Sequence, residues 1–184
     1  MPENKETYPI EIGGVKRDLR LFEVKPGLKI AIINILGDTE FVTACARELG
    51  KKLAGQDYDV LVTAESKSIP LVHALSVVTK KPYVVLRKEY KVYMGDAIQA
   101  ETVSITTGKP QTLILDEKDI PLVKGKKAAI VDDVISTGST LKGMRSILEK
   151  AGAHIALEAA IFTEGDPDEW SHIIALGHLP VFTD

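Results

Sequence analysis

The chain has 184 residues, 45% of them hydrophobic, and a formal net charge of −3 at pH 7. This length and composition fit one globular domain with a substantial core, and the slightly acidic balance gives no reason to expect nucleic acid as a partner. The single cysteine, Cys45, excludes an intrachain disulfide. No apolar run approaches the length of a membrane span, about 18 residues, and no signal-like run begins the chain. We therefore expect a cytoplasmic protein that does not contact a membrane.

The first part of the chain predicts β structure followed by one helix. Residues 1–20 predict irregular or short β structure. Residues 24–38 predict a Pro-Gly turn followed by an extended apolar segment. Asp38 and Thr39 are suitable helix caps, and the apolar residues that follow at intervals of four predict an amphipathic helix that ends near Gly55.

From residue 59 onward, short apolar strands alternate with helical segments. The expected strands are residues 59–65, 82–88, 111–117, 125–131 and 153–163. The expected helices are residues 69–79 and 139–150. This alternation predicts an α/β fold with a mostly parallel sheet flanked by helices. Residues 89–110 lack periodicity and predict a long loop or ribbon, which at that length is usually functional.

The stretch IVDDVISTGST, residues 130–140, carries the strongest functional signal. A buried strand is predicted to end at Asp132 and Asp133, and small residues then open a helix. Ligands of parallel sheets bind beyond the carboxyl ends of the strands, and the free N–H groups of a helix N-terminus favour an anion. The residues expected to bind a phosphate are Ser136, Thr137, Gly138, Ser139 and Thr140.

The two carboxylates predict a second ligand group beside the phosphate, because they would repel the phosphate unless they served another group. Sugar hydroxyls donate hydrogen bonds to carboxylates, so the pattern predicts a sugar phosphate as ligand. The alternative is a strand end with one capping aspartate and an ordinary Ser/Gly turn, which leaves the coincidence of these features unexplained. Neither the Walker P-loop pattern nor the dinucleotide fingerprint occurs in the chain.

The same stretch resembles the phosphoribosyl-pyrophosphate (PRPP) motif of type I phosphoribosyltransferases. Most of the chain is similar to adenine phosphoribosyltransferases. The likeness extends to VKPGLKIAIINILGD at residues 24–38, to the segment Glu65–Ser68, to Arg87-Lys88 and to residues 104–109. The resemblance implies a single domain over residues 1–184 with the type I phosphoribosyltransferase fold. A small hood would be built from about residues 1–37 and the C-terminal tail.

The resemblance also implies roles for individual residues. Asp132 and Asp133 would be the catalytic residues, which bind the ribose hydroxyls. The residues expected to bind pyrophosphate are Glu65, Ser66, Lys67, Arg87, Lys88 and Lys91. The residues expected beside the base are Lys29, Ile30, Ala31 and Glu164. Mg²⁺ would be the cofactor, held through substrate oxygens and water without direct protein ligands. Without the PRPP motif, the cations at residues 87, 88 and 91 would be typical of a solvated strand end.

The activity that the resemblance implies is transfer of the phosphoribosyl group of PRPP to a purine base, with adenine preferred, in a homodimer. Xanthine or guanine remains an alternative acceptor, since the segment SITTGKPQT resembles xanthine phosphoribosyltransferases. The sequence departs from the adenine family at Thr106 and Thr107, where that family has Glu-Tyr, and at Ser68, where it has Gly. A non-catalytic regulator that senses PRPP is the other alternative. Against it, the segment before Lys25 is too short for a DNA-binding domain and the charge balance is not basic.

Overall fold

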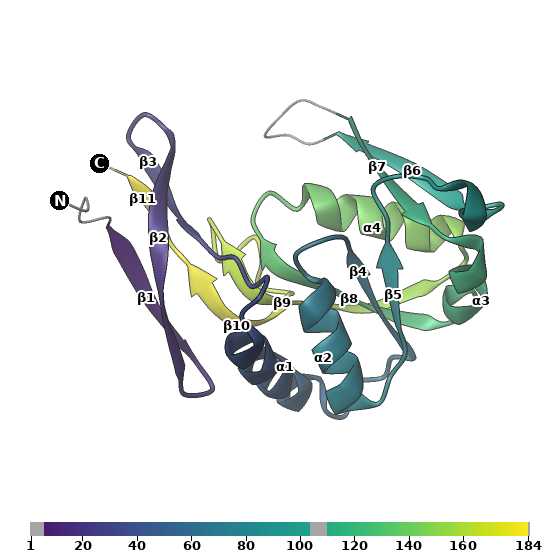
Figure 1. The fold of residues 1–184 in the computed structure, drawn as a ribbon, viewed down its shortest axis with the longest axis horizontal. Helices are drawn as coiled ribbons and strands as arrows, with labels where there is room; N and C mark the ends of the chain where they lie inside the picture. Colours follow the sequence, from purple (N-terminus) through teal and green to yellow (C-terminus); the bar gives the residue numbers. More distant parts are fainter. Residues whose placement is uncertain (1–5, 104–109, 184) are drawn as a thin grey trace.

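A computed structural model describes residues 6–103 and 110–183. Its centre is a five-stranded parallel sheet in the order β10-β9-β8-β4-β5 (Figure 1). The strands are β4 (Val60–Ala64), β5 (Tyr83–Leu86), β8 (Lys127–Ile135), β9 (His154–Glu164) and β10 (Ile174–Leu179). Each neighbouring pair in this sheet is parallel. The expected parallel α/β architecture is confirmed.

Helices cover both faces of this sheet. They are α1 (Thr39–Leu53), α2 (Ile69–Thr79), α3 (Ile120–Val123) and α4 (Ser139–Lys150), with short 3₁₀ turns η1 (Val92–Met94) and η2 (Glu117–Asp119). Successive strand residues point to opposite faces. On β8, Ala129 and Val131 therefore belong to one core cluster with α1 and α2, whereas Ala128 and Ile130 belong to another with α4.

A second sheet, the hood, stands beside the first (Figure 1). It is antiparallel in the order β1-β2-β3-β11. Its strands are β1 (Thr7–Ile12), β2 (Val15–Lys25), β3 (Leu28–Ile32) and β11 (Val181–Thr183). The first two strands form a regular hairpin, longer than the short β structure that the sequence predicts. Ile10, Ile12 and Leu19 bury one face of the hood in the core that contains α1.

The segment expected to be a loop or ribbon contains a ribbon. Strand β6 (Ile98–Val103) pairs antiparallel with β7 (Pro110–Leu115) in a separate two-stranded sheet. The backbone of Arg87 exchanges two hydrogen bonds of 2.8 Å with Ile114, which joins the ribbon to the end of β5. Residues 104–109, which include Thr106 and Thr107, lie outside the described residues.

Strand β8 is longer than predicted and corrects one boundary. It continues past Val131 to Ile135, so Asp132 and Asp133 lie within the strand. The cause is β9, which pairs with β8 as far as Ile135, whereas the pairing with β4 stops at Ile130. The carboxylates thus occupy a strand supported on one side only. Within the described ranges 6–103 and 110–183, no helix has the length and apolar character needed to cross a membrane.

Candidate active site

Two adjoining hollows open at the carboxyl edge of the parallel sheet. The first, about 290 Å³, is lined by residues 134–141 together with Lys88 and Asp132. The second, about 250 Å³, is lined by residues 64–68 together with Lys88, Asp132, Asp133, Val134 and Thr140. Lys88, Asp132, Val134 and Thr140 belong to both linings. The structure therefore brings two predicted segments together around Asp132: residues 136–140, called the phosphate loop below, and the segment Glu65–Ser68, called the pyrophosphate loop below.

One hydroxyl joins the two aspartates. Ser68 Oγ donates to Asp132 Oδ1 at 2.7 Å and lies 3.3 Å from Asp133 Oδ1. The same oxygen accepts a hydrogen bond of 3.0 Å from the backbone N–H of Asp133. Ser68 precedes α2, yet its side chain makes no helix-capping hydrogen bond, because its hydroxyl is used by β8. Ser68 was not among the residues predicted to bind a ligand; its only signals were its place at the end of the segment Glu65–Ser68 and a polar residue directly before an apolar helix.

The two carboxylates are close together and only partly compensated by hydrogen bonds and positive charge. Asp133 is buried, and its Oδ2 forms an ion pair with Lys67 Nζ at 3.3 Å but accepts no hydrogen bond within the described residues. Burial and the charge of Asp133 raise the pKa of Asp132 to about 7, against the opposing effect of the Ser68 hydrogen bond. Such a pair gains from a cation or from hydroxyl donors, both of which a magnesium-bound sugar phosphate supplies.

The phosphate loop is shaped for an anion. Gly138 has a φ of +69°, a left-handed conformation that glycine adopts without strain, and it immediately precedes α4. Thr137 Oγ1 and Ser139 Oγ lie 3.2 Å apart, so two hydroxyls gather beside the free N–H groups of the helix. The first hollow therefore has the donors that a phosphate needs.

The predicted cations separate into two groups. Lys67 lines the second hollow and Lys88 lines both. Arg87 instead forms an ion pair with Glu65 and lines a different hollow, at the outer edge of β5. Lys91 pairs with Glu89 at 2.9 Å and lines neither site hollow. Arg87 and Lys88 follow one another at a strand end and therefore face opposite sides.

The residues predicted beside the base lie in two places. Glu164 ends β9; it is half-buried, and burial raises the pKa of its carboxyl. Lys29, Ile30 and Ala31 lie in β3, between β2 and β11. The side chain of Ala31 is buried in the core, and Lys29 pairs with Glu6 at 2.8 Å. None of these four residues lines the two site hollows.

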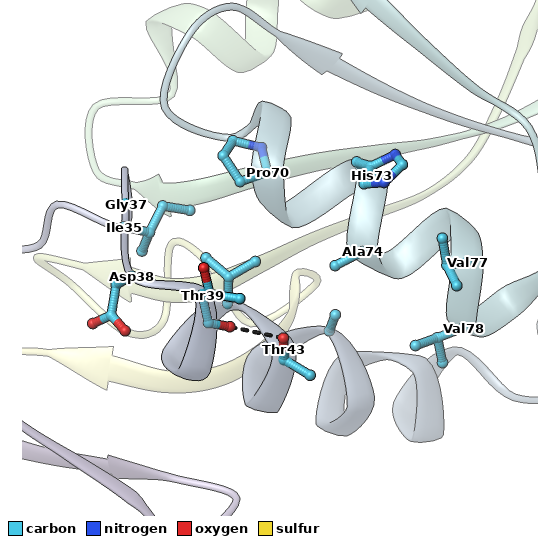
Figure 2. A pocket seen from close by; sticks show the side chains of 12 residues that line it. Ile35, Gly37, Asp38, Thr39, Thr43, Pro70, His73, Ala74, Val77 and Val78 are labelled. Atoms are coloured by element: carbon cyan, nitrogen blue, oxygen red, sulfur yellow. Dashed lines mark hydrogen bonds between the residues drawn. The ribbon is translucent and has the colours of Figure 1, made fainter.

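A larger hollow, about 420 Å³, lies between α1 and α2 and shares no lining residue with the site. Figure 2 shows Pro70, His73, Val77 and Val78 on α2 above Thr39 and Thr43 of α1. Its lining is mostly apolar, and Val77 and Val78 are 67% and 45% exposed. It lacks the cluster of charged and hydroxyl groups found at the carboxyl edge of the sheet.

Residues 34–173 match the phosphoribosyl transferase domain family. The chain belongs to the phosphoribosyltransferase family. Its fold is that of the type I phosphoribosyltransferases: it superimposes on adenine phosphoribosyltransferase from Thermoanaerobacter pseudethanolicus with a TM-score of 0.72, covering 87% of this chain and 95% of that one at 21% identity. The enzyme from Giardia lamblia, solved with 9-deazaadenine, gives 0.67 over 94% of this chain and 93% of that one at 16% identity. At these identities the likeness establishes the fold alone.

Two curated relatives have different functions. The chain is 36% identical over 118 residues to the hypoxanthine/guanine phosphoribosyltransferase of Methanothermococcus okinawensis, covering 64% of this chain and 61% of that protein. It is 27% identical over 158 residues to the purine biosynthesis transcriptional repressor PurR of Bacillus subtilis, covering 83% of this chain and 55% of that protein. The matched region thus spans less than two thirds of either relative's length.

Proposed function

We propose that this phosphoribosyltransferase transfers the 5-phosphoribosyl group of PRPP to a purine base and releases pyrophosphate, with adenine preferred. The observation that carries the proposal is the pair of adjoining hollows with Asp132 in both linings. A ligand with a phosphate at one end, a sugar in the middle and a pyrophosphate at the other fits two anion sites separated by carboxylates.

Each part of the site has a role in this reaction. The loop of residues 136–140 binds the 5′-phosphate, and Lys67 and Lys88 stabilise the departing pyrophosphate. Asp132 and Asp133 accept hydrogen bonds from the ribose hydroxyls. A ring nitrogen of the base forms a bond to C1′ while the bond from C1′ to pyrophosphate oxygen breaks, and the oxygen keeps the electron pair. No protein nucleophile is needed, so catalysis consists of positioning and charge stabilisation.

Magnesium fits the carboxylate pair. Among the residues that the structure describes, the buried Asp133 Oδ2 has the Lys67 ammonium 3.3 Å away but accepts no hydrogen bond. The neighbouring Asp132 has a raised pKa, so the pair favours further positive charge nearby. Mg²⁺ keeps several waters and binds through a few carboxylates together with substrate phosphates. When bound, it would neutralise charge on the pyrophosphate; Asp132 and Asp133 would hold it through its water ligands and the substrate, without direct ligation.

The acceptor base is proposed from Glu164 and from the relatives. The adenine phosphoribosyltransferases share the fold, and adenine offers a 6-amino donor to the half-buried Glu164 carboxyl. Guanine is the alternative, because it offers both N1–H and a 2-amino group to the same carboxylate and because a curated relative is a hypoxanthine/guanine enzyme. Xanthine is a further alternative acceptor. Pairing of such a carboxylate with donors on the base can change selectivity by orders of magnitude.

A PRPP-sensing role is the second candidate function. It is favoured by the likeness to PurR of Bacillus subtilis over 83% of this chain. Both candidates require PRPP to bind around Asp132, but only the enzyme needs a base to react. The two are therefore distinguished by turnover and not by PRPP affinity.

We also propose a homodimer. The apolar hollow between α1 and α2, with the exposed Val77 and Val78 at its edge, is a surface that a second copy would cover. Light scattering at micromolar concentration tests this: a dimer mass supports it, and a monomer mass contradicts it. If α2 forms the interface, Val77→Asp should dissociate the dimer and shift the measured mass toward that of a monomer.

Pyrophosphate release tests the proposed activity. The protein is mixed with PRPP and Mg²⁺, with adenine, guanine, hypoxanthine or xanthine added separately, and kcat/KM is measured for each base. We expect release that requires both PRPP and a base, and that is fastest with adenine. PRPP binding without release for any base would instead favour the sensing role.

A further inference from the structure

Trp170, the only tryptophan in the chain, lies directly behind the phosphate loop. Its side chain is 8% exposed and belongs to the core cluster that contains α4. The indole Nε1 donates a hydrogen bond of 3.1 Å to the backbone oxygen of Glu164. The far edge of the ring faces Gly138, where an added Cβ would lie 2.7 Å from Trp170 Cη2. One side chain thus touches two segments of the proposed site.

These two contacts join the phosphate loop to the end of β9. Gly138 is the left-handed residue that begins α4, and glycine restrains the backbone less than any other residue. Its position therefore depends on what surrounds it, and the indole ring blocks movement toward the core. Trp170 lines neither site hollow, so any effect on a ligand is transmitted through Gly138 and Glu164.

We propose that Trp170 is a positioning residue that fixes the phosphate loop against the end of β9, and that a phosphate bound in the loop changes the environment of the indole. The inference rests on the proposed function, since it takes the loop of residues 136–140 as the site of the ribose phosphate. Its physical basis is that backbone donors bind a phosphate tightly only when packing holds them in the right direction.

The single tryptophan gives a direct readout. Native protein is titrated with ribose 5-phosphate, and separately with PRPP and Mg²⁺, while fluorescence and calorimetry are followed. We expect the emission to change and to saturate with the calorimetric curve. Trp170→Phe removes the indole donor and the ring edge at Gly138, and should weaken ribose 5-phosphate binding about 3- to 30-fold. Ile173→Ala is the matched control: Ile173 is 8% exposed on the same segment, and its loss should lower stability while leaving affinity unchanged.

The outcomes separate the two proposals. Unchanged affinity in a folded Trp170→Phe protein overturns the positioning role and leaves the proposed function intact. If that variant does not fold, constant emission of the native protein during calorimetrically verified binding overturns it instead. Binding with an emission change, but no transfer to any base, overturns the proposed enzyme and supports the role of Trp170. Absence of binding to both compounds overturns both proposals.

Discussion

Ser68 donates its hydroxyl hydrogen to Asp132 Oδ1 at 2.7 Å, across 64 residues of sequence. The same hydroxyl oxygen accepts the backbone N–H of Asp133 at 3.0 Å. The start of α2 is therefore fixed to the end of β8 by a side chain that is 2% exposed. Because the two site hollows adjoin at this point, the contact sets how the pyrophosphate loop and the aspartates face each other.

Ser68→Ala should weaken both the fold and the site. It removes a buried hydrogen bond to a carboxylate and should lower the free energy of unfolding by about 1–3 kcal/mol, measured by urea denaturation. PRPP affinity should fall as well, since Asp132 loses the hydrogen bond that favours its ionised form. Ser76→Ala is the control, because Ser76 also lies on α2 and donates to the Lys81 oxygen at 2.6 Å, away from the site. Equal PRPP affinity in both variants would contradict this role of Ser68.

Asp132 should make the stability of the ligand-free protein depend on pH. Its folded-state pKa is raised to about 7, above the unfolded value of about 3.9. As pH rises between these values, the unfolded chain releases the proton first, so the free energy of unfolding falls; above about pH 7 this contribution is constant. The free energy of unfolding should fall by about 2 kcal/mol over this pH range. This is less than the full pKa difference would give, because Asp132 is half-buried and solvent screens its charge.

Asp132→Asn isolates this effect from the other carboxylates. From pH 4 to pH 7 the native protein should lose unfolding free energy relative to the variant. Above pH 7 the difference between the two proteins should stay constant. A difference that stays constant over this range would show that Asp132 has an ordinary pKa in the folded protein.

Lys88 and Arg87 should differ in their effect on PRPP binding. Lys88→Gln removes a cation from the lining of both hollows and should weaken PRPP binding by about 1.5–3 kcal/mol, the range for hydrogen bonds to charged groups. Arg87→Gln acts only through Glu65, whose carboxylate loses its partner and then repels the pyrophosphate. The double variant Glu65→Gln with Arg87→Gln should recover most of the affinity. Calorimetry that finds no recovery would mean that Arg87 binds the ligand itself.

The ion pair between Arg145 and Glu158 should hold α4 on the sheet. Glu158 is buried on β9, and Arg145 on α4 donates to both of its carboxylate oxygens. Arg145→Met leaves the carboxylate without this partner and should lower the unfolding free energy by about 2 kcal/mol, below the range for fully buried pairs because Arg145 is 37% exposed. Adding Glu158→Leu should restore stability in urea denaturation. His172 Nε2 also lies 3.5 Å from Glu158 Oε2. A double variant that is less stable than Arg145→Met would show that the Glu158 carboxylate, deprived of its arginine, does not cause the loss.

Local patterns predicted much of the fold and the strand-to-helix junction at residues 136–140, whereas long-range pairing decided the remainder of the fold. The loop from Ser136 to Thr140 was readable because five small residues at a strand-to-helix junction form one local signal. The continuation of β8 through Asp132 was not, because it depends on pairing with β9 and aspartate is a poor strand former. The hydrogen bond from Ser68 to Asp132 forms only because α2 and β8 meet in space, and no local sequence pattern predicts that contact.

The sequence alone also could not predict which way side chains point at the strand ends. The sequence places Arg87 and Lys88 together, but only the sheet decides that Lys88 lines the site while Arg87 pairs with Glu65. The three-residue strand β11 pairs with β3, which is about 150 residues earlier in the chain. No periodicity in the C-terminal tail therefore predicts this pairing.

A competition assay tests the central claim most directly. The native protein is incubated with PRPP, Mg²⁺ and equal concentrations of adenine, guanine, hypoxanthine and xanthine, with Asp132→Asn as a matched control, and the nucleotides formed are measured by mass spectrometry. We expect adenosine monophosphate as the main product, and far less of it from the variant. If no nucleotide forms, the proposed transferase activity is contradicted. A tenfold excess of another nucleotide over adenosine monophosphate would contradict the preference for adenine.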